Sequence, residues 1–338
     1  MATIIARPAA AVQAPDKAVP EQTMLVVWLD LEQIDAETIE SVGETISGFL
    51  AGDRVQDLGL GVPLGDPEEG IAKMAQTRDA MVENGAEGLL LMIDRPADDS
   101  WSPAMRALVK TSADADAEKL AELASGLSDE GDLSALAAPY ADGWHSLAIW
   151  RDGDEEQDIV LPAVTDGDEE VAAQFNLQLE EQGDAPFTLV FRMDETMKKR
   201  VDDMTAGGQQ QNPQMAMMMS MAGMLRGMDS LAVSLADEEG LNINIAMRFE
   251  DTEQATAFVQ MYNALMMMAP ALVAQQAQNM PDPPEPAMIN SFFAKLMMKP
   301  DGQTLRMELD PSFFEMAQQL SSLFEGMGIQ PENFNLDL

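Results

Sequence analysis

Residues 24–30 read Met-Leu-Val-Val-Trp-Leu-Asp, a short apolar run that ends in an acidic residue. Residues 188–194 read Thr-Leu-Val-Phe-Arg-Met-Asp and repeat this pattern. The sequence that follows each run has the same order of helical and extended periodicity. An internal repeat indicates that each copy forms one supersecondary unit. The sequence therefore predicts two related copies of a strand-helix-helix-strand-strand-helix-strand-strand unit.

Hairpins dominate the predicted strands, which places the fold in the α+β class. Residues 230–236 and 241–249 predict the two arms of a hairpin, and apolar and polar residues alternate in the second arm. This alternation is typical of an antiparallel sheet with one solvated face. The helical segments between the hairpins then predict mainly antiparallel sheets with helices packed on one face. Two separate sheets and one continuous sheet both fit the pattern.

The domain organisation follows from the repeat and from the composition of the segments around it. We expect a tail or export-signal remnant at 1–21, a first α+β repeat at 22–165, a linker at 166–185, a second α+β repeat at 186–324 and a C-terminal tail at 325–338.

The composition is strongly acidic and contains no cysteine. The chain has 59 Asp and Glu residues against 19 Lys and Arg, for a formal charge of -40. A field of this sign repels nucleic acid and anionic lipid headgroups, so we expect no nucleic-acid partner. The absence of cysteine excludes disulfides, thiolate nucleophiles and cysteine-based metal centres. His145 is the single histidine, so sites that need several imidazoles within one chain are excluded.

The first residues suggest export from the cytoplasm. Residues 12–14 read Val-Gln-Ala, and these small residues before Pro15 and Asp16 suit a signal-peptidase site. The run before them is short for a complete export signal, so a flexible tail is the alternative. No stretch reaches the ~18 consecutive apolar residues of a membrane-spanning helix, and we expect no integral membrane segment.

Two acidic residues occupy matching positions in the repeat. Asp30 and Asp194 each follow an apolar strand, and a duplicated carboxylate could mark two equivalent sites. Helix N-capping is the interpretation that the pattern favours, because Asp accepts backbone N–H groups after a strand. A carboxylate-based hydrolase that uses these residues remains an alternative.

The other candidates for chemistry are weaker. The acidic runs 152–158 and 166–170 would suit calcium, but neither has the spacing of a calcium-binding loop. No Gly-x-Ser-x-Gly sequence and no complete phosphate-binding loop occur. The composition around His145 favours a partly buried structural histidine. The sequence thus predicts no catalytic residue, no metal ligand and no cofactor.

Methionine is the one unusual enrichment, with 28 residues. The predicted helix 214–228 is apolar on nearly all faces, which indicates burial on more than one side. Methionine in the core is the favoured interpretation, and an adaptable apolar binding or self-association surface is the second. A Cu(I) site made of thioethers is the third. The candidate ligand or partner surface comprises Met215, Met217, Met218, Met221 and Met224.

Two short stretches resemble exported bacterial envelope proteins of unknown function. Residues 19–23 read Val-Pro-Glu-Gln-Thr and lead into the strand that ends at Asp30. Residues 240–249, followed by Asp251 and a helix that contains Ala255, are similar to the same proteins. The resemblance implies an envelope location, and it implies no activity and no functional residues.

These observations together predict a non-enzymatic, extracytoplasmic binding or scaffold protein. Its partner would be a protein or an apolar ligand, and self-association is possible. Pockets favour domain interfaces, so the cleft between the two repeats is the expected ligand site, together with the helix 214–228. The alternatives are a carboxylate-based hydrolase and an exported protein that binds Cu(I) or Ca²⁺.

Overall fold

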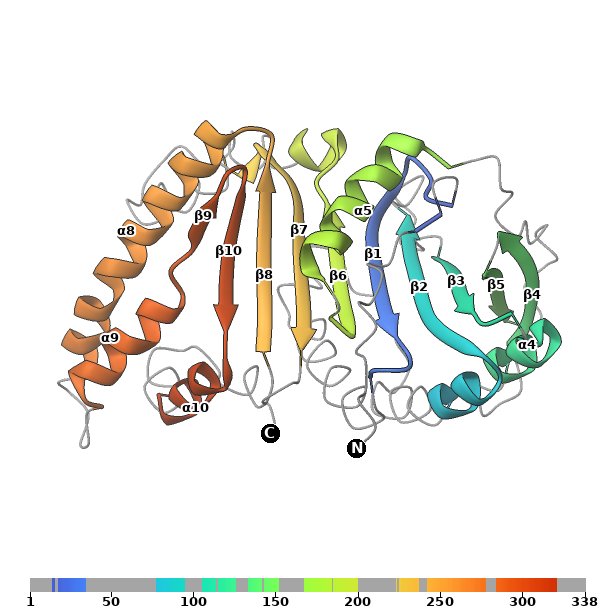
Figure 1. Cartoon of the computed structure of the whole chain (residues 1–338). Coiled ribbons are helices and arrows are strands. Elements are labelled where there is room, and N and C mark those ends of the chain that lie inside the picture. Colours follow the sequence, from blue (N-terminus) through green and yellow to red (C-terminus); the bar gives the residue numbers. More distant parts are fainter. Residues whose placement is uncertain are drawn as a thin grey trace, which may run out of the picture. The chain divides into compact units, whose positions relative to one another are not determined.

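The computed structural model describes residues 14–15, 18–34, 77–94, 105–113, 115–125, 133–141, 143–151, 167–183, 185–199, 223, 225–236, 242–277 and 284–320. Within these residues the chain up to Val190 forms one compact unit, and the chain from Phe191 onward belongs to a second. Each unit contains antiparallel strands and helices, so the predicted α+β class is confirmed (Figure 1).

Unit 1 has the strand order β4-β5-β3-β2-β1, and each of these strands pairs antiparallel with its neighbours in this order. Helix α4 packs against β4 at the outer end of this order. The elements of unit 1 are β1 (Thr23–Asp30), β2 (Ala86–Asp94), β3 (Met105–Thr111), α4 (Ala117–Ser125), β4 (Leu133–Ala141), β5 (Trp144–Arg151) and α5 (Glu169–Gln182). The division between the units falls inside the next strand, β6 (Phe187–Arg192).

Unit 2 has the strand order β7-β8-β10-β9. The long helix α8 packs against α9 and also contacts the strands β8, β9 and β10. The elements of unit 2 are β7 (Met228–Ala236), β8 (Asn242–Phe249), α8 (Thr252–Ala277), α9 (Pro286–Lys295), β9 (Lys299–Asp301), β10 (Thr304–Leu309) and α10 (Pro311–Gln319).

The two units share their internal strand order and one irregularity. When β2, β3, β4 and β5 are matched with β7, β8, β9 and β10, the order of strands is the same in both units. The β2–β3 pairing shifts its register at Glu87, and the β7–β8 pairing shifts at Asp229, the second residue of its strand. Each is the extra residue of a β-bulge, a feature that re-aims the strand that carries it. The common origin of the two halves stays a prediction.

Unit 1 is held together by tightly packed aromatic residues. The Trp28 and Trp144 rings meet edge to face with centroids 6.3 Å apart, and both side chains are buried. The Trp28 ring lies directly over Gly88, where an added Cβ would come within 1.9 Å of Cη2. Only glycine therefore fits at position 88 while Trp28 keeps its position.

A buried carboxylate connects three strands of unit 1. Asp94 on β2 is 2% exposed and accepts a hydrogen bond from the Thr23 hydroxyl of β1 at 2.7 Å. Its other oxygen pairs with Arg106 Nε of β3 at 3.2 Å. The buried charge is thus both hydrogen-bonded and ion-paired, which is the condition under which burial is tolerated.

Two apolar clusters form the core of unit 2. The first joins Phe249, Phe258 and Leu305, so the N-terminal half of α8 packs on β8 and β10. The second joins Val273 with Phe292 and Phe313, so the C-terminal half of α8 packs with α9 and α10. By length and composition, Thr252–Gln275 within α8 is the one helix of the described chain that could cross a membrane.

The structure departs from the predicted boundaries in three places. Ala14, Ala18 and Val19, expected in the tail 1–21, are buried. Asn176 holds Ala14 by donating to its carbonyl at 3.0 Å and accepting its N–H at 2.7 Å. The predicted linker 166–185 contains helix α5, because its apolar residues recur at helical spacing and pack inward. Met228 is the first residue of β7 and not the last residue of a helix, because Arg226 and Gly227 form a turn before it.

Candidate functional site

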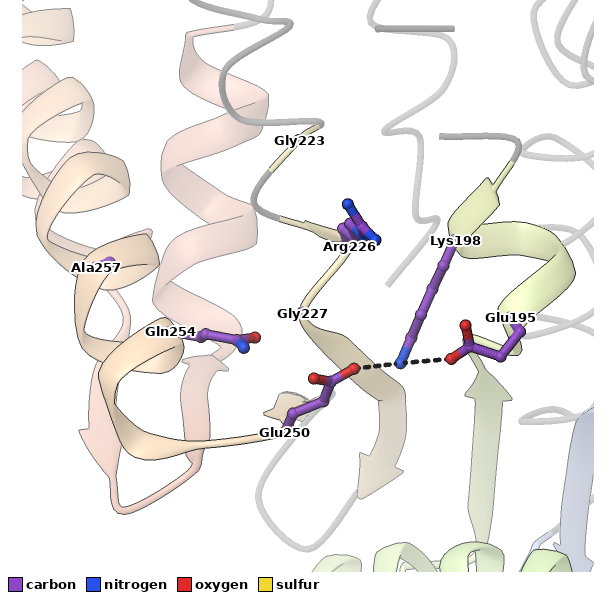
Figure 2. A pocket seen from close by; sticks show the side chains of 8 residues that line it. All are labelled: Glu195, Lys198, Gly223, Arg226, Gly227, Glu250, Gln254 and Ala257. Atoms are coloured by element: carbon purple, nitrogen blue, oxygen red, sulfur yellow. Dashed lines mark hydrogen bonds and ion pairs between the residues drawn. The ribbon is translucent and has the colours of Figure 1, made fainter. Parts of the chain in front are cut away.

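Unit 2 contains a cavity of about 480 Å³ that mixes charged and small residues. It lies where the helical residues 195–199, the turn before β7 and the junction between β8 and α8 come together (Figure 2). The lining residues are Glu195, Lys198, Gly223, Arg226, Gly227, Glu250, Gln254 and Ala257.

Local capping positions the side chains that line the cavity. Asp194 Oδ1 accepts the Met197 N–H at 2.9 Å and starts the short helix that carries Lys198. Glu250 follows β8 directly, and its N–H donates to the Gly227 carbonyl at 2.9 Å. Asp251 caps the first turn of α8 by accepting the N–H of Gln254. Both walls of the cavity are therefore built on helix starts that directly follow strands.

Lys198 is the central group of the site. Its ammonium lies 2.6 Å from Glu250 Oε1, 3.5 Å from Asp229 Oδ1 and 3.6 Å from Glu195 Oε1. Figure 2 shows the nitrogen between Glu250 and Glu195, with dashed lines to both. Lys198 is 8% exposed, and a buried ammonium is stable only when carboxylates compensate its charge.

The three carboxylates keep this lysine charged. Burial would lower the pKa of Lys198, but the hydrogen bond to Glu250 and the attraction of all three carboxylates outweigh it and raise the pKa. The hydrogen bond from Lys198 also holds the pKa of Glu250 below its usual value. Burial has the opposite effect on Asp229, whose pKa is raised although Lys198 offsets part of the shift. Lys198 thus has one partner, Glu250, whose charged form is stabilised, and another, Asp229, whose charged form is destabilised.

Gly227 makes room for the amide of Gln254. A Cβ at position 227 would lie 1.6 Å from Gln254 Oε1, so the side chain of Gln254 occupies the space that a larger residue would take. The oxygen of this amide is fully buried and has no hydrogen-bond partner within the described part of the chain. Gln254 contributes a hydrogen bond that stabilises the charge of Glu250. The amide therefore orients one wall of the cavity.

The charged side chains that line the cavity could recognise a charged ligand. A lysine with a raised pKa stays protonated at neutral pH, so it cannot act as a nucleophile or a general base. Glu250 is committed to Lys198, and its lowered pKa is unsuited to an acid catalyst. Among the described residues, no three His, Cys, Asp or Glu side chains gather as metal ligands.

The two predicted carboxylates both accept backbone N–H groups. Asp30 Oδ1 accepts the N–H groups of Glu32 and Gln33 at 3.1 Å each. Asp194 caps the helix that carries Lys198, so it supports the cavity without lining it. The structure thus gives each of these residues a positioning role in its own unit.

The methionines Met215, Met217, Met218, Met221 and Met224 lie outside the described residues. Met224 stands in sequence between Gly223 and Leu225, and both Gly223 and Arg226 line the cavity. Gly223 and the turn residues Arg226 and Gly227 are thus the described part of this segment that lines the site. The remaining methionines of that segment stay a prediction.

Two further candidates have structural partners. His145 Nδ1 lies 3.1 Å from the Thr111 hydroxyl, and the ring is half-buried on β5. Asp168, from the second acidic run, caps α5 by accepting the Glu170 and Val171 N–H groups at 2.8 and 3.1 Å. The first acidic run, 152–158, lies outside the described residues.

Sequence reasoning missed Lys198, Glu250 and Gln254. One signal was present, because Lys198, Lys199 and Arg200 form a basic cluster in a chain with only 19 basic residues. In such an acidic chain, a basic cluster is expected to form ion pairs with carboxylates. Their identity depended on long-range contacts, since Glu250 lies 52 positions away.

No protein-family model, no curated protein and no solved structure matches this chain.

Proposed function

We propose that this chain is a non-enzymatic binding or scaffold protein that acts outside the cytoplasm, with the cavity of unit 2 as its ligand site. The observation that carries the proposal is the three-carboxylate environment of Lys198. The three carboxylates hold Lys198, the most buried charged group of the cavity, in one position and keep it protonated. Fixed charges of this kind orient a ligand, whereas general acid–base catalysis needs a group that exchanges a proton near neutral pH.

The hydrolase alternative needs two carboxylates whose pKa values are separated so that one acts as an acid and one as a base. Asp30 and Asp194 each use one carboxylate oxygen to accept backbone N–H groups, which is the structural role that the sequence pattern favours. Glu250 has a lowered pKa, and Lys198 holds it in place. These contacts favour binding over hydrolysis.

The charges around the cavity indicate the kind of ligand. Glu195, Glu250 and Asp229 supply three carboxylates, against the cations of Lys198 and Arg226. Together these five side chains carry one net negative charge, which is part of the formal charge of -40 for the whole chain. A ligand that carries an amine or guanidinium, on a small molecule or on the basic side chain of a protein, suits this environment.

The proposal is tested by adding small amines and short basic peptides to the purified chain and measuring the melting temperature. A bound ligand raises the melting temperature in proportion to the logarithm of its concentration. The mixture is then examined by mass spectrometry. We expect a concentration-dependent increase and no change in the mass of the ligand. Conversion of any ligand to a product, lost in Glu250→Gln, would identify an enzyme instead.

The matched control for the cavity is Glu315→Gln, because Glu315 is an exposed carboxylate on α10 that does not line the cavity. It removes the same charge as Glu195→Gln. We expect Glu195→Gln to weaken binding about tenfold, as for the loss of one charge-assisted contact, and Glu315→Gln to have little effect. Equal weakening by both variants would show diffuse attraction to an acidic surface.

The extracytoplasmic location is supported by the small residues 12–14 before Pro15, which suit a signal-peptidase site. Fractionation of cells that express the full chain with a C-terminal tag tests it. Recovery of the protein in the periplasmic or surface fraction is expected. Recovery in the cytoplasm alone contradicts this part of the proposal.

A further inference from the structure

Helix α8 contains an apolar surface without any charge. Residues 254–281 include no Asp, Glu, Lys, Arg or His, although charged residues make up 23% of the chain. The helix therefore interrupts an otherwise acidic surface. Figure 1 shows α8 as the long orange helix beside α9 in unit 2.

One side of α8 belongs to the core of unit 2, and the other faces solvent. Phe258 and Val273 lie on the buried side. Met267, Met268 and Leu272 lie on the other and are 63%, 59% and 64% exposed. Only 17% of the most apolar window of the helix is buried. These three side chains, together with the exposed Ala264 and Ala271, form what we term the α8 face.

The α8 face calls for a covering partner. A helix that is apolar on nearly all sides is normally enclosed, either by protein or by lipid. Exposed large apolar side chains that lie together mark interaction sites more often than scattered ones do. Methionine is unbranched and polarisable, so Met267 and Met268 can adapt to a partner that has no fixed shape.

Electrostatic repulsion distinguishes between the possible partners of the α8 face. A second copy of the chain would bring another formal charge of -40 toward the first, and anionic lipid would be repelled in the same way. An uncharged lipid surface neither repels the chain nor requires basic residues, which the α8 face lacks. We propose that the α8 face docks peripherally on an electrically neutral lipid surface, such as zwitterionic phospholipid.

The same contacts explain why α8 would lie along the surface and not cross it. Its buried side carries Phe258 and Val273, which are packed into the two core clusters of unit 2. Crossing the bilayer would require these side chains to leave both clusters. Insertion of Met267, Met268 and Leu272 leaves the core intact, in the manner of an interfacial helix.

The test uses the full chain and vesicles of pure phosphatidylcholine in a flotation assay. We expect the wild-type protein to float with the vesicles, and binding to fall when about a third of the lipid is replaced by phosphatidylglycerol at low salt. Met267→Glu and Leu272→Glu should each weaken binding about tenfold, because a charge is placed in the lipid contact. Both positions are exposed, so these variants keep the fold, which circular dichroism checks.

Two controls keep the experiment decisive. Gln318→Glu adds the same charge at an exposed position on α10, and it should float like the wild type. Met268→Gln removes apolarity without adding charge and should bind less than the wild type. The proposal is overturned if neutral vesicles do not bind the protein, or if all variants float equally. It is also overturned if ultracentrifugation finds a dimer that Met267→Glu dissociates, because the α8 face would then bind a second copy.

Discussion

The two carboxylates nearest Lys198 should respond to neutralisation in opposite ways. We consider Glu250→Gln and Asp229→Asn, which each remove one charge and keep the size of the side chain. Glu250 lies 2.6 Å from the ammonium and has a lowered pKa, whereas Asp229 lies 3.5 Å away and has a raised pKa. The first carboxylate is therefore stabilised in its charged form, and the second is destabilised.

The magnitudes follow from these contacts. A charge-assisted hydrogen bond contributes about 1.5–3 kcal/mol when it is protected from water. Glu250 is 47% exposed, so we reduce this to about 1 kcal/mol for Glu250→Gln at neutral pH. Asp229→Asn should increase the free energy of unfolding slightly, by about 0.5 kcal/mol or less, because relief of desolvation outweighs the lost attraction to Lys198.

The two carboxylates should also differ in how their contributions to stability depend on pH. The stability that Glu250 contributes is present above its ordinary pKa and is lost as the pH falls through its lowered folded-state pKa. The raised pKa of Asp229 works in the other direction, so its contribution is present below its ordinary pKa and is lost as the pH rises through the folded-state value. The deficit of Glu250→Gln should therefore shrink as the pH falls through the lowered pKa of Glu250.

Urea denaturation followed by far-ultraviolet circular dichroism measures both variants at neutral and acidic pH. Equal losses in the two variants would refute the reasoning, as would a deficit of Glu250→Gln that persists in acid. The exposed Glu315→Gln serves as the reference for removing one negative charge from unit 2.

Two other substitutions test the packing of unit 1 by calorimetry. Gly88→Ala should lower the free energy of unfolding by about 2–3 kcal/mol because the Trp28 ring must move. Gly183→Ala, at a positive φ with open space, should lower it by only about 1 kcal/mol. Equal losses would contradict the proposed clash. Asn176→Ala should lower the free energy of unfolding by about 2 kcal/mol because it removes both hydrogen bonds to Ala14. It should also speed proteolysis before residue 18. Unchanged proteolysis would show that other contacts hold this segment.

The strands were the most predictable part of the fold. The alternation in residues 241–249 and the apolar run at 24–29 each gave a strand in the expected place, because period-two patterning reflects burial on one side of a sheet. Pairing order was not predictable in the same way. It depends on contacts such as that of β3 with β5, which are distant in sequence.

The boundaries failed where local composition conflicted with tertiary contacts. Residues 14–20 are rich in alanine and proline and look like a tail, but Asn176 on α5 fixes Ala14 by two hydrogen bonds to its backbone. The segment 166–185 begins with acidic residues and looks like a linker. Those residues cap and start α5 instead, since Asp168 accepts two backbone N–H groups.

The candidate site was the least predictable part. Asp30 and Asp194 stood out because they recur, but recurrence in a repeat also marks structural caps. Lys198 and Glu250 did not recur and belong to different elements, so only the folded chain brings them together. The three-carboxylate environment of Lys198 depends on contacts between residues that are distant in sequence, so no local motif predicts it.

The positions of the tryptophans make intrinsic fluorescence specific to one part of the chain. All four tryptophans, at positions 28, 101, 144 and 150, precede residue 191, and none occurs after it. Indole fluorescence excited near the red edge of the absorption band therefore reports only on the N-terminal part of the chain. A tryptophan introduced after Phe191 would add a second, separable signal. The order in which the two units lose their structure could then be read from light emission alone.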